Sequence, residues 1–294
     1  MTKTAFLAIV GRPNVGKSTL LNTVCGEKIA IVSNKPQTTR NRITGIYTKG
    51  EDQFVFLDTP GIHKPRTVLG DYMVRTANGS IGEADAILLV VEPVPSVGEI
   101  EAGIIEKIRA SKTPAILVVN KVDEHTPADI AATIAAYAAA YDFDAVVPIS
   151  AKSGKGVDAL FEEASKFLYE SVWYFPEDAV TDQPERQIAA EIIREKLLRT
   201  LNKEIPHGTA VVIEEFREEK NIIRIRAEIF CEKASHKGII VGKNGAALKL
   251  VGTYAREDLE KFLGTKVYLN LWVKVKENWR ESAATVGNFG YRDE

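Results

Sequence analysis

One segment, Gly11–Ser18, constrains the fold of this chain more than any other part of its sequence. Its residues, Gly-Arg-Pro-Asn-Val-Gly-Lys-Ser, match the phosphate-loop pattern G-x-x-x-x-G-K-[ST]. The segment directly follows an apolar run, Ala5–Val10, that is typical of a buried strand, and it opens a helical stretch. A strand that passes through such a loop into a helix directs backbone N–H groups at phosphate oxygens. The sequence therefore predicts an α/β domain that binds a nucleotide.

Four further short apolar runs, several of them separated by helical stretches, indicate a sheet that is buried on both faces. Alternating strands and helices build βαβ units, in which the strands run parallel. We therefore predict a mostly parallel sheet in a first domain over residues 1–175. The four runs are Phe54–Asp58, Ala86–Val91, Ala115–Asn120 and Ala145–Ile149.

The character of the sequence changes after residue 175. Prolines and acidic or amide residues within Phe175–Pro184 predict a linker, which we place at residues 176–186, with a helix following at about 183–203. Hydrophobic and polar residues then alternate in three segments, as they do in half-buried strands. The predicted order of elements is α-β-β-α-α-β-α, a smaller α+β domain over residues 187–294. The alternating segments are 211–216, 223–229 and 267–273.

The phosphate loop supplies groups for both a nucleotide and a metal ion. Lys17 can reach the β- and γ-phosphates, and the Ser18 hydroxyl is an oxygen ligand of the kind that Mg²⁺ binds. Backbone amides of the loop surround the phosphates at close range, where a side chain on either glycine would obstruct them. The predicted nucleotide-binding residues of this loop are Asn14, Val15, Gly16, Lys17, Ser18 and Thr19.

Two later motifs are predicted to select the base. The first, Asn120-Lys-Val-Asp123, follows one apolar strand, and Ser150-Ala-Lys152 follows another. The Asp123 carboxylate can accept two N–H donors from guanine, whereas adenine offers no such pair. We expect Asn120 to serve the N7 side of guanine, the neighbouring lysine stem to lie over the ring, and the Ala151 amide to donate to O6. The predicted ligands are therefore GTP and GDP, and the base-binding residues are Asn120, Lys121, Asp123, Ser150, Ala151 and Lys152.

A third motif, Asp58-Thr-Pro-Gly61, is predicted to sense the γ-phosphate. Asp58 can bind Mg²⁺ through water, and the Gly61 amide can contact the γ-phosphate. Before this motif, Thr38 and Thr39 each offer a hydroxyl for the Mg²⁺ shell, and their adjacency leaves the choice between them open. Many GTPases place a water-orienting glutamine directly after this glycine, but Ile62 stands here and can neither donate nor accept a proton. We therefore expect slow intrinsic hydrolysis.

Together these motifs resemble those of translation-factor-class GTPases. The phosphate loop, the segment 36–40 and the second domain together resemble the Era family of bacterial GTPases over essentially the whole chain. The resemblance implies that Thr39 binds Mg²⁺ beside Ser18, and that Asn14 helps to hold a potassium ion beside the phosphates. It also implies that Lys17, Thr39 and Gly61 are the catalytic residues. The expected cofactors are thus GTP or GDP, Mg²⁺ and K⁺.

In the second domain, Gly242-Lys-Asn-Gly245 joins two helical segments at about 235–241 and 246–262 and lies between strands. This context resembles the type II KH module, in which a G-x-x-G loop lets two helix ends clamp about four nucleotides. Residues 220–280 carry 13 basic and 6 acidic side chains, which favours a polyanion partner. We expect two isoleucines to form a floor for the bases. The predicted RNA-binding residues are Lys237, Ile239, Ile240, Gly242, Lys243, Asn244, Gly245 and Lys249.

The predicted architecture is therefore a P-loop GTPase domain with a mostly parallel sheet, followed by a smaller α+β type II KH domain. Three aromatic residues of the second domain, Tyr268, Trp272 and Trp279, are interpreted as core or edge packing rather than as platforms for stacked bases.

Composition excludes several classes of protein. With 294 residues, 45% hydrophobic and 27% charged, the chain is neither disordered nor of low complexity. Its longest apolar runs fall far short of the about 20 residues that a membrane helix needs. The two cysteines, Cys25 and Cys231, have no partner motif for a metal or a disulfide. We expect a soluble, cytoplasmic protein.

The resemblance to the Era family implies partners that the residues alone do not. These are 16S rRNA near its 3′ end, the small (30S) ribosomal subunit during its assembly, and loose peripheral contact with the inner membrane; we also expect a monomer. Two alternatives stay open. One is a GTP-dependent adaptor whose C-terminal domain binds protein rather than RNA, and the other is a housekeeping nucleotide hydrolase with a substrate domain.

Overall fold

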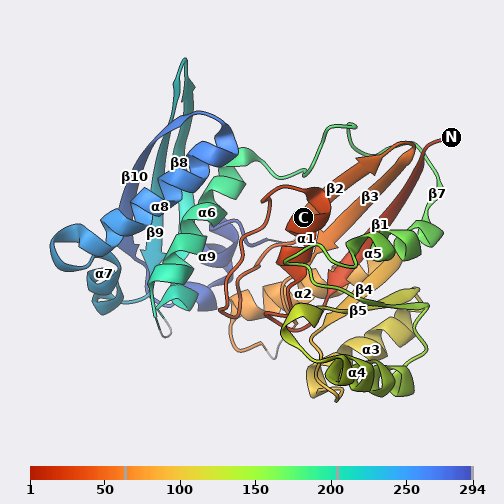
Figure 1. Cartoon of the computed structure of the whole chain (residues 1–294). Helices are drawn as coiled ribbons and strands as arrows, with labels where there is room; N and C mark the ends of the chain where they lie inside the picture. The colour runs from red at the N-terminus through yellow and green to blue at the C-terminus, as the bar shows by residue number, and fades with distance from the viewer. Residues whose placement is uncertain (63–64, 203–204, 293–294) are drawn as a thin grey trace. The chain divides into compact units, whose positions relative to one another are not determined.

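The computed structural model describes residues 1–62, 65–202 and 205–292, and the chain forms two compact units (Figure 1). The division along the main part of the chain falls between Asp182 and Gln183. Two short segments of the N-terminal half, 31–38 and 66–72, belong to the second unit. The first unit comprises Met1–Ala30, Thr39–Pro65 and Met73–Asp182, and the second comprises Ile31–Thr38, Arg66–Tyr72 and Gln183–Glu294.

The first unit is built on one sheet with the strand order β2-β3-β1-β4-β5-β6. Strands β1, β3, β4, β5 and β6 pair in parallel, which confirms the predicted mostly parallel sheet. β2 pairs antiparallel with β3, and the short β7 pairs antiparallel with β1. Neither was predicted, because neither contains a continuous apolar run. The strands are β1 (Lys3–Val10), β2 (Ile43–Lys49), β3 (Asp52–Asp58), β4 (Ala86–Val91), β5 (Ala115–Val119), β6 (Ala145–Pro148) and β7 (Tyr169–Glu170).

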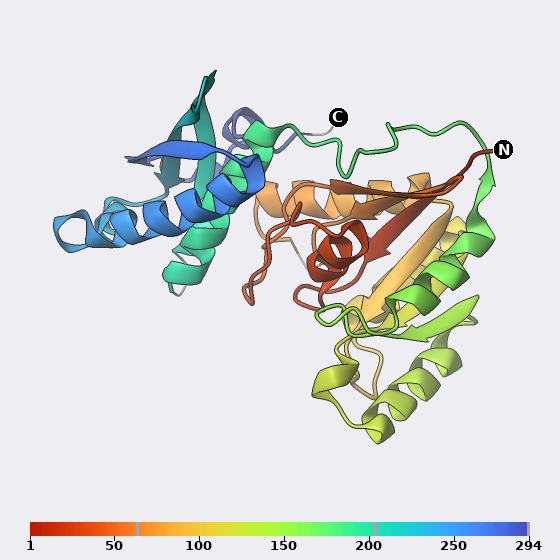
Figure 2. The same cartoon turned by 45° about the horizontal axis from the view of Figure 1, so that its top comes forward.

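Helices cover both faces of this sheet (Figure 2), which is why its central strands are apolar throughout. α1 and α5 share one hydrophobic cluster with the sheet, whereas α2, α3 and α4 share the cluster on the opposite face. The loops that carry the predicted nucleotide motifs all leave the carboxyl ends of parallel strands, so they meet at one edge. The helices are α1 (Lys17–Cys25), α2 (Val68–Glu83), α3 (Glu99–Ser111), α4 (Pro127–Ala140) and α5 (Val157–Ala164).

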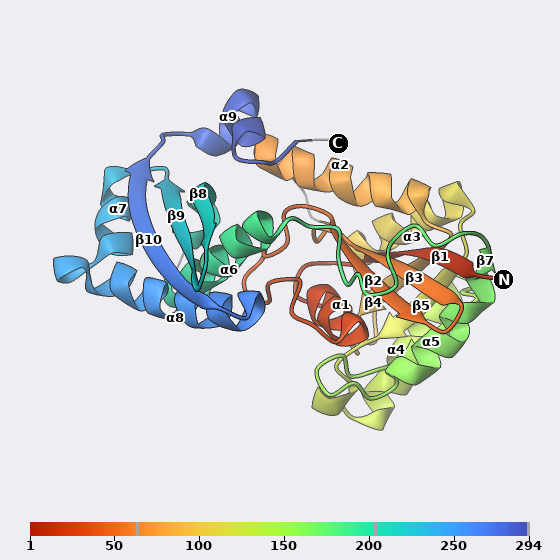
Figure 3. The same ribbon diagram turned by 90° about the horizontal axis from the view of Figure 1, so that it is seen from above.

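The second unit contains a three-stranded sheet of order β10-β9-β8 (Figure 3). β9 and β10 are parallel and β8 is antiparallel to β9, which agrees with the predicted type II arrangement. Helices α6, α7 and α8 share the hydrophobic core with one face of the sheet. The elements are α6 (Glu185–Thr200), β8 (Ala210–Glu219), β9 (Ile222–Cys231), α7 (Ala234–Val241), α8 (Ala246–Leu263), β10 (Lys266–Val275) and α9 (Ala283–Asn288). Over the described residues, no helix has the length and apolar character required to cross a membrane.

Of the three aromatic residues predicted to pack in the core or at an edge, one lies in the core. Trp279 is fully buried, and its Nε1 donates a hydrogen bond to the carbonyl oxygen of Gly208 at 2.9 Å. Tyr268 and Trp272 are instead 51% and 58% exposed. Both lie on β10, where successive residues alternate between the core and the outer face, and both point away from the core. Core packing is therefore wrong for these two rings, which lie on β10 at the edge of the sheet.

Candidate nucleotide site and nucleic-acid interface

The phosphate loop turns sharply between β1 and α1 because two glycines adopt backbone conformations that other residues avoid. Gly11 and Gly16 have φ angles of 153° and 99°. A Cβ on Gly11 would lie 2.4 Å from the carbonyl oxygen of Val90, and a Cβ on Gly16 would lie 2.2 Å from Nδ2 of Asn120. The loop is thus packed closely against the ends of β4 and β5, with the N-terminus of α1 directly behind it.

Lys17, the first residue of α1, turns back over the loop. Its Nζ donates to the carbonyl oxygens of Gly11 and Arg12 at 3.2 and 3.0 Å. Burial lowers the pKa of Lys17 to about 8, against the attraction of Asp58, which raises it. A phosphate beside this ammonium group would favour its charged form. The lysine is therefore placed to hold negative charge at the loop.

Three oxygen-bearing side chains meet beside the start of α1. Ser18 Oγ lies 2.7 Å from Oδ2 of Asp58 and 2.8 Å from Oγ1 of Thr39. Burial raises the pKa of Asp58 to about 6, although Lys17 and the hydrogen bonds oppose this rise. The second carboxylate oxygen, Oδ1, is buried and accepts no hydrogen bond from the described residues. Two hydroxyls and a buried carboxylate with an unsatisfied oxygen fit a magnesium ion, which prefers hard oxygen ligands.

The other candidate, Thr38, uses its hydroxyl elsewhere. Its Oγ1 lies 2.7 Å from Oγ of Ser33 and donates to the carbonyl oxygen of Lys35 at 2.6 Å. The carbonyl oxygen of Thr38 accepts a hydrogen bond from Arg194 of α6, whose fully buried guanidinium also donates to the carbonyl oxygen of Gln37 at 3.5 Å. These contacts lie within the second unit. Arg194 could not be predicted from the sequence, because its backbone partners lie more than 150 positions away.

Asn120 ties the base motifs to the phosphate loop. Its Nδ2 donates to the carbonyl oxygen of Val15 at 2.8 Å, and its Oδ1 accepts from the amide of Ala151 at 2.9 Å. The side chain is only 2% exposed. The Ala151 amide, which we expected to donate to O6 of guanine, is thus engaged with Asn120. One buried amide group fixes three loops relative to one another.

The charged residues of the base motifs lie nearer the surface. Asp123 is exposed, and a hydrogen bond from Ser150 holds the pKa of its carboxyl below the usual value. The Lys121 ammonium pairs with Glu92, which also pairs with Arg12 of the phosphate loop. No motif pointed to Glu92. The available signal was its position directly after a buried strand, at the edge of the sheet where the motifs meet.

The Asp-x-x-Gly motif packs on the phosphate loop. A Cβ on Gly61 would lie 2.8 Å from backbone atoms of Pro13, and the amide of Ile62 donates to the carbonyl oxygen of Gly11 at 3.3 Å. The Ile62 side chain is buried in the cluster that contains α2. It therefore serves as an apolar contact and provides no group that can orient water. Across the loop, Asn14 is exposed with φ of 67°, whereas Val15 is buried and Thr19 half-buried.

In the second unit, the G-x-x-G loop connects α7 and α8 through three residues with positive φ angles. Gly242, Asn244 and Gly245 have φ angles of 73°, 52° and 77°. A Cβ on Gly242 would lie 2.7 Å from Cβ of Ala247, whereas one on Gly245 would meet nothing within 4 Å. Gly242 is thus required by the packing of the two helices, and Gly245 leaves open space through which a backbone can approach.

The side chains predicted to bind RNA divide into exposed and buried groups. Lys237, Lys243 and Lys249 are exposed around the loop, as is Ile239. Ile240, which was predicted to share the floor for bases, is fully buried in the hydrophobic core of the unit. This assignment is corrected: adjacent residues of a helix point in directions about 100° apart, so one isoleucine faces solvent and the other faces the sheet.

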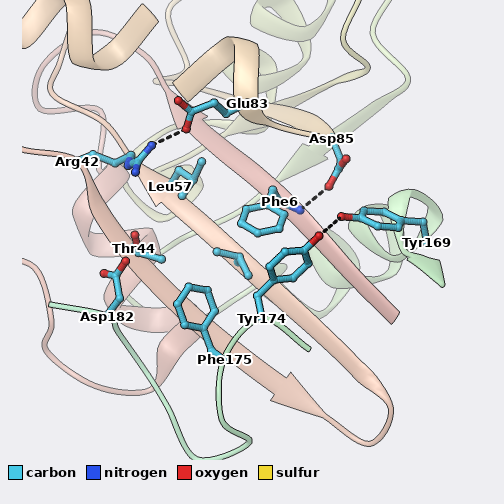
Figure 4. A pocket seen from close by; sticks show the side chains of 11 residues that line it. Phe6, Arg42, Thr44, Leu57, Glu83, Asp85, Tyr169, Tyr174, Phe175 and Asp182 are labelled. Atoms are coloured by element: carbon cyan, nitrogen blue, oxygen red, sulfur yellow. Dashed lines mark hydrogen bonds and ion pairs between the residues drawn. The ribbon is translucent and has the colours of Figure 1, made fainter. Parts of the chain in front are cut away.

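A separate cavity of about 320 Å³ lies in the first unit (Figure 4). None of the predicted site residues lines it. Its charged groups are already held by the protein, since Arg42 pairs with Glu83 at 2.5 Å and Asp85 accepts from the amide of Phe6 at 2.8 Å. It is therefore not the predicted nucleotide site. The lining residues are Phe6, Arg42, Thr44, Val55, Leu57, Glu83, Asp85, Tyr169, Tyr174, Phe175 and Asp182.

Comparisons with known proteins support both halves of this arrangement. A family model described as "50S ribosome-binding GTPase" matches residues 6–121, and one described as "KH domain" matches residues 204–280. The protein named GTPase Era of Clostridioides difficile is 53% identical over 296 residues, which span 100% of each chain. GTPase Era of Clostridium kluyveri is 50% identical over 293 residues, or 99% of this chain and 100% of that one.

Two solved structures are similar over 99% of each chain at 40% identity. One is a variant of Aquifex aeolicus Era bound to GDP and AlF4⁻, with a TM-score of 0.95. The other is Era in complex with MgGDPNP and nucleotides 1506–1542 of 16S ribosomal RNA, with a TM-score of 0.94.

The position of Asn120 generates a stability prediction. Asn120→Ala should lower the free energy of unfolding by about 2–4 kcal/mol, because it leaves a buried carbonyl and a buried amide without partners. Chemical denaturation of the nucleotide-free protein measures this. Lys152→Ala, at an exposed position of the neighbouring motif, is the control and should change the free energy by less than about 0.5 kcal/mol. Equal stability of the two variants would contradict the bridging role.

Proposed function

Because this chain belongs to the Era family of GTPases with a C-terminal KH domain, we propose that its GTP cycle controls the binding of 16S rRNA during assembly of the small ribosomal subunit. The chain itself is a GTPase. The observation that carries the RNA part of the proposal is its full-length similarity to Era in complex with MgGDPNP and nucleotides 1506–1542 of 16S ribosomal RNA. Loose peripheral contact with the inner membrane and a monomeric state remain predictions, as does the division into domains at 175 and 187.

Within the nucleotide site, we propose that Lys17 holds the β- and γ-phosphates and that the Gly61 amide contacts the γ-phosphate. Ser18 and Thr39 would bind Mg²⁺, with Asp58 behind them, and the ion would neutralise charge on the phosphates when it is bound. The support for Thr39 over Thr38 is the distance of 2.8 Å from Thr39 Oγ1 to Ser18 Oγ.

The base would be bound by residues that play two different parts. Asp123 supports the guanine preference, since its carboxylate is ionised and exposed at the rim. Asn120 and the Ala151 amide contribute by fixing the loops, because they already bond one another. Lys121, Ser150 and Lys152 complete the predicted base site.

We further propose that nucleotide state reaches the second unit along the backbone between two threonines. Thr38 belongs to the second unit, where Arg194 holds its carbonyl oxygen, and Thr39 belongs to the first, where it lies beside Ser18. A shift of the Thr39 hydroxyl on loss of the γ-phosphate would therefore pull directly on a segment that the buried arginine holds. This supplies a short mechanical route for a switch.

The pKa of Asp58 generates a pH prediction. Its pKa of about 6 lies above the ordinary value, so protons compete with Mg²⁺ as the pH falls through 6, and Mg²⁺ affinity in the presence of GDP should then fall up to about tenfold per pH unit. Calorimetric Mg²⁺ titrations between pH 5 and 8 measure it. Asp58→Asn should bind Mg²⁺ more weakly at pH 8 and show a flatter profile, which separates the carboxyl from the phosphates of GDP. Identical profiles for both proteins would contradict the assignment.

The apolar residue at position 62 generates a prediction about potassium. We propose that Asn14, exposed on the phosphate loop, helps to hold K⁺ beside the phosphates, where the cation would supply charge that Ile62 cannot. The kcat for GTP should be at least about tenfold higher in KCl than in NaCl at equal ionic strength, the scale of one charge-stabilising contact. Asn14→Ala should remove most of that difference. Equal kcat in the two salts would rule out the potassium site.

The RNA part of the proposal is tested by charge reversal on the G-x-x-G loop. Lys243→Asp should weaken binding of an RNA spanning nucleotides 1506–1542 by at least about tenfold at moderate salt, because it replaces attraction to the phosphates by repulsion. Fluorescence anisotropy with the GTP analogue GDPNP bound measures it. Lys220→Asp, a charge reversal in the turn between β8 and β9, is the matched control and should have a smaller effect. If Lys243→Asp binds RNA as the unaltered chain does, the KH assignment of this site fails, and a protein-binding adaptor becomes the better account.

A further inference from the structure

We propose that the outer face of the three-stranded sheet in the second unit is an additional contact surface for single-stranded RNA, on which Tyr268 and Trp272 each stack an unpaired base. The inference rests on the proposed function, since it extends the RNA beyond the nucleotides held at the G-x-x-G loop. It concerns a different face of the same unit, which the motif does not identify.

The two rings are presented by the geometry of β10. Val267 and Val273 of this strand point into the core and are buried, whereas Tyr268 and Trp272 point outward. The two aromatic residues are four positions apart on the same face, or about 13 Å along the strand. They therefore form two separate flat surfaces in one row, with Asn270 between them.

The fold covers one aromatic ring of this face and leaves the other two open. Phe230 of β9 packs against Phe289, with ring centroids 4.5 Å apart, and Phe230 is only half-buried. Tyr268 and Trp272 remain 51% and 58% exposed, which is unusual for large rings on a strand. Since the C-terminal segment covers Phe230 but not its neighbours, the exposed pair is a surface that the fold itself does not use.

Basic groups are interleaved with these rings. The guanidinium of Arg224 lies over the Tyr268 ring, 5.1 Å from its centroid. Arg226 stands opposite Asn270 on the next strand, and Lys274 follows Trp272 on the same face. Aromatic side chains that stack bases, beside cations that track the backbone, are the recurring features of surfaces that bind single-stranded nucleic acid.

The acidic groups on this face do not oppose such a partner strongly. Arg224 pairs with Glu219 at 3.0 Å and Lys274 pairs with Glu228. Both cationic side chains are about half exposed, so these pairs contribute little and can be exchanged for contacts with phosphate. The cations therefore favour a negatively charged partner over an apolar protein surface, and the exposed rings favour one with bases that stack, as RNA has.

The surface is continuous with the proposed RNA site. α7 and α8, which the G-x-x-G loop joins, both contact β10, and β10 is the edge strand of the sheet. Only two residues separate the end of α8 from the start of β10, so the two run in opposite directions and the later part of β10 lies nearer the loop. A strand that leaves the loop across this edge would meet Trp272 first and Tyr268 second.

This order gives a test with RNAs of graded length. The full chain is titrated with single-stranded RNAs of increasing length, all starting with the same four nucleotides, using fluorescence anisotropy. Trp272→Ala and Tyr268→Ala should each leave the four-nucleotide RNA unaffected and weaken the long RNA about tenfold. The loss in Trp272→Ala should begin at a shorter length than the loss in Tyr268→Ala.

Variants that keep an aromatic ring at each position serve as controls for the alanine variants. Trp272→Phe and Tyr268→Phe retain a ring and should bind the long RNA within about threefold of the unaltered chain. Quenching of tryptophan fluorescence by long RNA should disappear in Trp272→Phe while affinity is retained, which reports stacking at that position. Both side chains are more than half exposed, so these variants should unfold at the same denaturant concentration as the unaltered chain.

The outcomes separate this inference from the proposed function. If both alanine variants bind the long RNA as the unaltered chain does, while Lys243→Asp loses binding, the surface does not contact RNA and the inference is overturned. If Lys243→Asp binds every RNA normally, the RNA site itself is wrong. If the alanine variants lose the four-nucleotide RNA to the same degree as the long one, the rings do not form an additional surface, and the inference is again overturned.

Discussion

The nucleotide site depends on one buried side-chain amide. Asn120 satisfies the carbonyl oxygen of Val15 on one side and the amide of Ala151 on the other, so three loops from three strands share a single hydrogen-bonded centre. The phosphate loop leaves no room around it, because a Cβ at Gly16 would lie 2.2 Å from its nitrogen. Loops have few contacts of their own, and a rigid site built from them needs such a link. In the proposed site, this link would set the distance between Asp123, at the base, and the loop that holds the phosphates.

A second constraint is the free-energy cost of burying two charged side chains at the site. Lys17 and Asp58 are both buried, and burial favours the neutral form of each. It lowers the pKa of Lys17 to about 8 and raises the pKa of Asp58 to about 6. In the protein alone, each group therefore loses its charge more readily than it would in water. A bound partner of opposite sign would stabilise the charged form of each. In the proposed site, a phosphate would stabilise the charge of Lys17 and a cation would stabilise the charge of Asp58. In the proposed site, bound nucleotide and bound Mg²⁺ would therefore each favour the binding of the other.

Local sequence predicted the parallel sheet, the order of elements in the second unit and the motifs at the sheet edge, because each depends on short-range periodicity or on a fixed spacing. It could not predict contacts that the fold brings together from a distance. Glu92 joins Arg12 to Lys121, and Arg194 holds the carbonyl oxygen of Thr38, yet neither lies in a motif. The sequence also could not predict which face of a helix or strand is exposed where both faces carry apolar residues. Ile240 was expected at the surface and is buried, and core packing was considered for two exposed rings on β10, since apolar character alone does not say which face of an element a neighbour will cover.

The second unit shows why that distinction matters for function. A small sheet with helices on one face must present its other face to solvent, and most such faces are polar. Here the helices contribute the core together with Val267 and Val273, and the opposite side of the same strand carries Tyr268 and Trp272 beside Arg224. Exposed rings add nothing to the stability of the core, and their hydration is unfavourable until something covers them. A partner with flat apolar faces and a negative backbone satisfies both the rings and the cations, whereas an apolar protein surface would bury the cations without compensation.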